Sequence, residues 1–174
     1  MRTTKKITVS AMLVALGAVL LTVGALWDLV DLTAAAVASL LVAFVYVELG
    51  SPYTWLTWLA TSLICFIIFP ARIVWVEYFL IFGIFPIIKA YIERLPRALW
   101  LIVKLVYINA VITLLFFAVE FIVGTPFFTS ANKWINAGLW ILMNVAFVVY
   151  DMFISVMVRL YLTKYRHRFR RFLK

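Results

Sequence analysis

Six apolar stretches of this chain are each long enough to cross a lipid bilayer as an α-helix, which takes about 17–25 residues. Hydrophobic residues make up 67% of the 174-residue sequence, against roughly 45–50% in soluble domains. Glycine and proline fall between the stretches, where they end helices. The sequence therefore predicts an all-α integral membrane protein, a six-transmembrane-helix bundle that forms one membrane domain over residues 1–174. The predicted spans are 7–27, 33–49, 53–69, 73–92, 99–123 and 134–162, and the second and third are separated by so few residues that we expect one long hydrophobic hairpin.

Basic residues are distributed unevenly about these six spans. Fourteen of the 16 Lys and Arg residues precede the first span, surround the connection between the fourth and fifth, or follow the sixth. Only Arg72 and Lys133 lie on the opposite side. Because positively charged loops stay in the cytoplasm, we predict a multi-pass protein of the cell membrane with both termini inside. Residues 163–174 then form a basic cytoplasmic tail.

The net charge of +9 is explained mainly by this topology and by attraction to the anionic headgroups of membrane lipids. A protein or nucleic acid that docks on the tail is the weaker alternative. The sequence carries no RNA-binding motif, so we predict no nucleic-acid partner.

The side chains on which most enzymes and metal sites depend are scarce. Cys65 and His167 are the single cysteine and histidine, which excludes a cysteine-pair metal site and a Ser-His-Asp triad. The sequence has no phosphate-binding loop of the ATPase type, and no two of its seven carboxylates form a recognisable catalytic pair. We predict a protein that is not an enzyme and uses no metal or cofactor. A membrane enzyme or lipid flippase is a third, less favoured class.

Polar side chains within the last three spans indicate a candidate binding site. A charged group at mid-bilayer costs ~2.5–3.5 kcal/mol on insertion scales, so each one implies protein or water around it. At 100° per residue, Asn109 and Glu120 share one face of the fifth span, and the polar residues from Asn136 to Asp151 share one face of the sixth. We predict an externally open, aromatic-walled cup for a small organic substrate. Its predicted residues are Trp75, Glu77, Asn109, Glu120, Trp140 and Asn144.

The alternative for these residues is structural. Polar side chains in membrane bundles often hydrogen-bond neighbouring helices, and tryptophans near span ends often anchor at the interface. Glu48 and Glu93, near inner helix ends, are expected to be solvated or salt-bridged. Lys104 lies about 140° around the helix from Asn109 and is expected to snorkel to the cytoplasmic interface.

Small residues of the first span form a narrow seam. Ala11, Ala15, Ala18, Thr22 and Ala25 follow one another at spacings of four, three, four and three. Small residues let membrane helices approach closely, so the seam serves either internal packing or the docking of another membrane protein. The inner part, Ala11, Ala15 and Ala18, is the predicted partner-binding surface.

The start of the chain carries a resemblance to a known family. Residues 5–17, KKITVSAMLVALG, combine a basic start with an Ala-x-x-x-Ala pair. With six spans, cytoplasmic ends and this length, the chain resembles the substrate-binding S component of an energy-coupling factor vitamin transporter. The resemblance implies capture of a micronutrient outside the cell. It also implies association, through Ala11 and Ala15, with a transmembrane coupling subunit that carries two ATPase subunits.

The resemblance names no substrate, because no thiamine-, riboflavin- or biotin-type binding signature is present. The alternative function is a non-transport membrane scaffold of cell-envelope machinery, similar to the rod-shape-determining MreD family.

Overall fold

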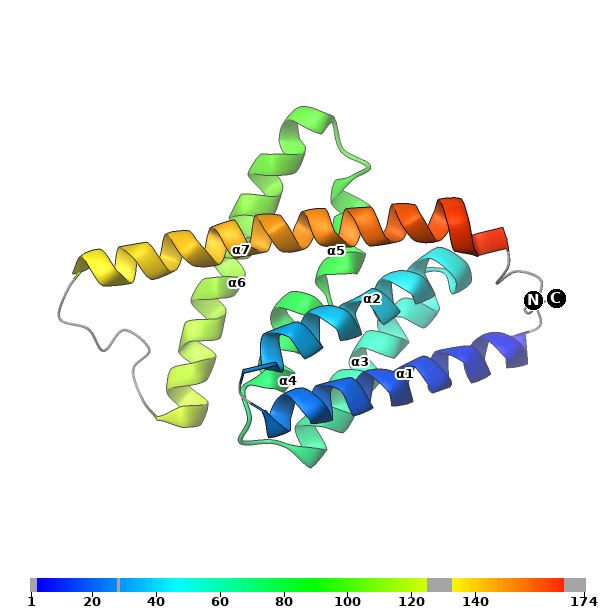
Figure 1. Cartoon of the computed structure of the whole chain (residues 1–174), viewed down its shortest axis with the longest axis horizontal. Coiled ribbons are helices and arrows are strands. Elements are labelled where there is room, and N and C mark those ends of the chain that lie inside the picture. Colours follow the sequence, from blue (N-terminus) through cyan, green and yellow to red (C-terminus); the bar gives the residue numbers. More distant parts are fainter. Residues whose placement is uncertain (1–2, 28, 125–132, 168–174) are drawn as a thin grey trace.

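The computed structural model describes residues 3–27, 29–124 and 133–167, and every regular element in these residues is helical. The first three helices are α1 (Thr3–Leu26), α2 (Asp31–Leu49) and α3 (Ser51–Ile68) (Figure 1). The remaining elements are α4 (Val74–Glu77), the π-helical turn η1 (Tyr78–Phe82), α5 (Phe85–Ile92), α6 (Arg97–Val123), α7 (Lys133–Leu160) and the π-helical turn η2 (Tyr161–Tyr165).

Six segments in the described residues are long and apolar enough to cross a membrane, with Val74–Ile92 as the fourth. The prediction of an all-helical chain with six membrane-spanning candidates is thus confirmed for the described residues, with boundaries shifted by a few residues. The predicted basic tail begins within η2, and its residues 168–174 lie outside the described part of the chain.

Successive connections alternate between two sides of the molecule, as spans that cross a membrane require. In Figure 1 the start of α1, the α2–α3 turn, the α5–α6 connection and η2 lie to the right and top. The α1–α2 and α3–α4 connections, the end of α6 and the start of α7 lie to the left and bottom. The beginning of α1 and the end of η2 are therefore on the same side.

The first three helices pack closely on one another. A single residue, Gly50, separates α2 from α3, and its φ of +91° is a backbone conformation that residues with a side chain rarely adopt. The predicted hairpin is therefore present. On α1, a Cβ added at Gly24 would lie 2.9 Å from the Cβ of Ala34, so this glycine allows the close approach of α1 and α2.

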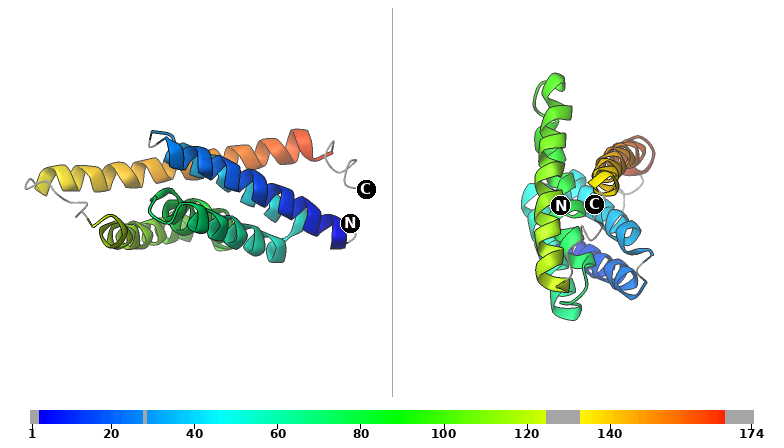
Figure 2. Two further views of the ribbon diagram at one scale, coloured as in Figure 1. Left: turned by 90° about the horizontal axis from the view of Figure 1, so that it is seen from below. Right: turned by 90° about the vertical axis from the view of Figure 1, so that its left-hand side faces the viewer.

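The spans are not all parallel. Figure 1 shows α6 crossing behind α7 at a steep inclination, and the left view of Figure 2 shows α6 nearly end-on while α7 runs along the page. The α4–α5 segment packs against α6, and α7 packs against α2 as well as α6. Charged and polar side chains of α5, α6 and α7 meet where these three helices approach one another.

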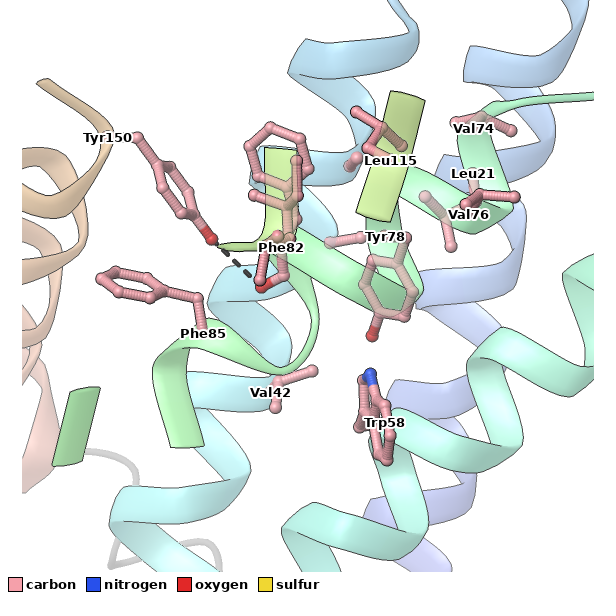
Figure 3. Packing of buried hydrophobic residues seen from close by; sticks show 14 of the residues in the cluster. Leu21, Val42, Trp58, Val74, Val76, Tyr78, Phe82, Phe85, Leu115 and Tyr150 are labelled. Carbon is pink, nitrogen blue, oxygen red and sulfur yellow. Dashed lines mark hydrogen bonds between the residues drawn. The ribbon is translucent and has the colours of Figure 1, made fainter. Parts of the chain in front are cut away.

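The fourth span, predicted as one helix over 73–92, is interrupted in its middle. Pro86 has no N–H, so the carbonyl of Phe82 has no α-helical donor four residues ahead. The Gly83 N–H bonds to the Tyr78 carbonyl at 2.6 Å, the wider spacing of a π-helix. The Tyr150 hydroxyl of α7 donates to the Phe82 carbonyl at 3.1 Å and so occupies the vacant acceptor (Figure 3).

Two further side chains bind carbonyl groups of the same turn. Trp58 of α3 donates its indole N–H to the Phe79 carbonyl at 3.2 Å, and Tyr107 of α6 donates to the Leu80 carbonyl at 3.0 Å. A Cβ at Gly83 would lie 2.6 Å from the Trp58 ring, so only glycine fits beside the indole. The turn η1 is therefore the point at which three helices are joined to the fourth span, and the buried core surrounds it.

Candidate functional site

Three of the six predicted substrate-binding residues form one hydrogen-bonded group between α6 and α7. The Asn109 amide nitrogen donates to Asn144 Oδ1 at 3.1 Å, and Trp140 Nε1 donates to Asn109 Oδ1 at 2.7 Å. The Asn144 amide nitrogen donates to the Trp140 carbonyl at 3.0 Å. All three side chains are half-buried. Their principal polar atoms are thus satisfied by one another and by the backbone.

The other three predicted residues make no hydrogen bond, ion pair or ring contact with this group in the described part of the chain. Trp75 donates its indole N–H to the Pro70 carbonyl at 3.1 Å and packs its ring against Phe66. Glu77 is 8% exposed, and its Oε2 has no hydrogen-bond partner. Glu120 is exposed on α6. An outward-facing cup that unites all six residues stays a prediction.

A cluster of opposite charges joins α5, α6 and α7 nearer the other end of these helices. Lys104 Nζ lies 2.7 Å from Asp151 Oδ2, while Lys89 Nζ pairs with Asp151 Oδ1. Lys89 Nζ also donates to Ser155 Oγ at 2.8 Å and lies 3.2 Å from Glu93 Oε1. The lysine side chains are only 7% and 10% exposed. One carboxylate on α7 thus holds two ammonium groups from two other helices.

The prediction that Lys104 snorkels to the interface is wrong. Its side chain turns into the protein, because the Asp151 carboxylate offers a buried ammonium a charged hydrogen-bond partner. The expectation that Glu48 and Glu93 are salt-bridged or solvated is confirmed. Glu93 pairs with Lys89, and Glu48 Oε1 lies 3.1 Å from Arg166 Nε.

Sequence reasoning placed Asp151 on the polar face of the sixth span but missed its pairing with the lysines. A signal was present, since Lys89, Lys104 and Asp151 all lie within about a dozen residues of the inner ends of their predicted spans. Buried charges in the same half of the membrane on neighbouring helices need one another as partners.

An open cavity of about 610 Å³ lies beside this cluster, between α2, α5 and α7. Its walls include Lys89 and Glu93 of the cluster, together with Arg94, Trp100 and Arg159. A second, mostly apolar groove of about 400 Å³ lies between α2 and the α7–η2 segment. The two share Ala43, Val47 and Val158 as lining residues and therefore adjoin.

A third, smaller cavity of about 210 Å³ lies at the opposite end of the molecule, beside Asp31 and Arg72. None of the six predicted substrate-binding residues lines any of these three cavities. Among the described residues, no group of three or more His, Cys, Asp and Glu side chains is placed to hold a metal ion.

The alanine seam of α1 divides into two halves. Ala18 and Ala25 are buried in the core, whereas Ala11 and Ala15 are exposed. The buried half packs against α2 and α3, where Gly17 lies close to Thr61. The surface that remains for a partner helix is therefore the Ala11–Ala15 half, and Ala18 serves internal packing.

Comparison with protein-family models, with curated proteins and with solved structures finds no match for this chain.

Proposed function

We propose that this protein is the membrane-embedded substrate-capturing subunit of an uptake system whose ATP-hydrolysing parts are separate subunits. The observation that carries the proposal is the exposure of Ala11 and Ala15 on a helix whose other face is packed. Two small residues one turn apart allow a partner helix to approach the backbone closely, which is how helices associate in lipid. The partner is the transmembrane coupling subunit, and the substrate is a small micronutrient.

We propose that the protein lies in the cell membrane with both termini in the cytoplasm. This orientation is supported by the distribution of basic residues and by the shared side of the α1 start and η2 (Figure 1). In this orientation the Ala11–Ala15 surface lies in the inner half of the membrane. That depth suits a partner which connects to cytoplasmic ATPase subunits.

The proposed substrate site remains the outer region of α4, α6 and α7. Glu77 supports it, because a buried carboxylate oxygen without a donor is free to accept a hydrogen bond from a ligand. Asn109 and Asn144 contribute only if the substrate replaces the hydrogen bonds that they now make with each other. Trp75 and Trp140 supply ring faces for stacking, and Glu120 supplies a charge near the external end.

The test is gentle detergent purification of the full chain from its native membrane, with mass spectrometry of the proteins and small molecules retained. Ala15→Trp adds bulk on the proposed contact surface, so we expect it to release the coupling and ATPase subunits while the chain stays folded. Leu16→Trp is the matched control, since Leu16 is exposed and lies about 100° further around α1. Equal retention of the ATPase subunits by both variants would contradict the proposed contact at Ala11 and Ala15.

A scaffold of cell-envelope machinery is the second candidate. It is favoured by the mutual hydrogen bonding of Asn109, Trp140 and Asn144, which leaves these groups complete without a ligand. Retention of cell-wall synthesis proteins, without ATPase subunits and without a small molecule, would support this candidate in the same purification.

A further inference from the structure

The cavity beside the charge cluster and the groove that adjoins it differ in the side chains that line them. The larger part, near the α5–α6 connection, carries four charged side chains and two aromatic rings on a wall that is otherwise mostly aliphatic. The adjoining groove is lined by Leu40, Phe44, Met157 and other apolar or aromatic residues of α2, α7 and η2. Both parts are open at the surface of helices that are long and apolar enough to face lipid. The pair therefore forms a cavity with several charged side chains that continues into an apolar groove.

The charges of the polar half do not cancel. Lys89 and Lys104 are offset by Asp151 and Glu93, with which they pair. Lys89 has no donor to spare, because its ammonium already contacts Asp151, Glu93 and Ser155. The cluster is thus neutral overall, and its members Lys89 and Glu93 contribute to the cavity wall.

Two guanidinium groups on the cavity wall supply the excess charge. Arg94 is exposed and makes one hydrogen bond, from Nη2 to the Tyr46 hydroxyl at 3.3 Å, while its guanidinium lies over the Tyr91 ring. Arg159 is exposed and forms no ion pair with a carboxylate in the described part of the chain. Arginine presents a planar fork of donors that fits phosphate oxygens, so these two side chains favour a phosphate.

We propose that this composite groove binds one anionic phospholipid. The headgroup phosphate lies between Arg94 and Arg159, and an acyl chain lies along the groove between α2 and α7. A phosphate alone would leave the apolar half empty, whereas an acyl chain alone would leave two guanidinium groups without a counter-charge. Basic pockets between transmembrane helices on the cytoplasmic side are known to bind anionic lipid headgroups. With the proposed orientation, the lipid comes from the inner leaflet.

This inference does not depend on whether the protein takes part in uptake or acts as a scaffold. It requires only that the chain lies in a bilayer, and the lipid then connects α2, α5 and α7 at their shared end.

The test is lipid titration of the delipidated full chain in detergent, followed by native mass spectrometry. The probes are phosphatidylglycerol, phosphatidylcholine with the same acyl chains, and inorganic phosphate as competitor. We expect one bound phosphatidylglycerol in preference to phosphatidylcholine, with no competition from phosphate. Equal binding of the two lipids would overturn the proposal. Full competition by phosphate would show that the site binds a small anion and not a lipid, and would overturn the proposal.

Variants locate the bound lipid. Arg94→Gln and Arg159→Gln should each weaken phosphatidylglycerol binding by about tenfold, as loss of a charged hydrogen bond does. Arg159→Lys keeps the charge but not the planar fork, so it should bind more tightly than Arg159→Gln and more weakly than the wild type. Met157→Trp should block the apolar half. Arg72→Gln, at the opposite end of the molecule, is the control. Wild-type affinity in both Gln variants, with unchanged thermal unfolding, would contradict the site.

Discussion

Lys104 Nζ lies 2.7 Å from Asp151 Oδ2, and this contact joins α6 to α7 within the membrane-spanning part of the protein. Lys89 of α5 approaches the other oxygen of the same carboxylate. Each charge offsets the cost of burying the next, so the three helices depend on one another at this point.

Replacement of the shared carboxylate should destabilise the protein more than replacement of an exposed one. Asp151→Asn leaves two nearly buried ammonium groups with a weaker partner. We expect the free energy of unfolding to fall by roughly 2–3 kcal/mol, below the cost for a fully buried pair because Asp151 is 19% exposed. Unfolding in mixed detergent measures the change, with Glu120→Gln, an exposed carboxylate on α6, as the matched variant.

A second substitution separates charge pairing from simple packing. Adding Lys104→Met to Asp151→Asn removes one of the two stranded ammonium groups, so the double variant should be more stable than the sum of the single changes predicts. Strict additivity of the two changes would show that the pair is not coupled.

The Asn109 group offers a test that distinguishes structure from ligand binding. Asn109→Ala leaves the Trp140 N–H and the Asn144 amide without their present partners, so stability should fall by about 1–3 kcal/mol even without any ligand. Thr113→Ala is the control, because that hydroxyl bonds only to a carbonyl of its own helix. If the variant unfolds like the wild type but loses uptake or ligand binding, the residue acts on a substrate instead.

The space beside the π-helical turn η1 should be too small for any side chain at position 83. Gly83→Ala would place a methyl group 2.6 Å from Trp58 Cδ1 and 2.9 Å from the Tyr78 ring, and both rings are buried. We expect a loss of about 1–3 kcal/mol in the free energy of unfolding. Gly138→Ala on α7 is the matched variant, since nothing lies within 4 Å of its added methyl group. Similar melting temperatures for the two variants would argue against the tight fit.

Membrane orientation can be read from chemical labelling of single cysteines in a Cys65→Ala background. Leu29→Cys lies in the α1–α2 connection and should react with an impermeant maleimide added outside intact cells. Leu95→Cys, in the α5–α6 connection, should react only after the membrane is permeabilised. The reverse pattern would invert the proposed orientation.

The six spans and the Gly50 hairpin could be predicted from the sequence, because both depend on local properties. The length of an apolar run decides whether a helix can cross a bilayer, and a glycine between two such runs permits a turn. Helical rotation also placed Asn109 and Asn144 on polar faces of their spans.

Side-chain pairing could not be predicted in the same way. Rotation at 100° per residue gives the face on which Lys104 lies, but the partner depends on the steep approach of α6 to α7 (Figure 1). The alanine seam has the same difficulty, since regular spacing predicts that Ala11 and Ala18 share a face. It does not indicate that neighbouring helices cover Ala18 and leave Ala11 open.

The interrupted fourth span has a consequence for membrane insertion. Carbonyl groups of η1 accept hydrogen bonds from side chains of α3, α6 and α7, two of which are synthesised after the fourth span. While the later helices are absent, the Leu80 and Phe82 carbonyls lack these donors, and an unpaired carbonyl in hydrocarbon is costly. During biogenesis the fourth span should therefore stay beside the insertion machinery or water until α6 and α7 arrive.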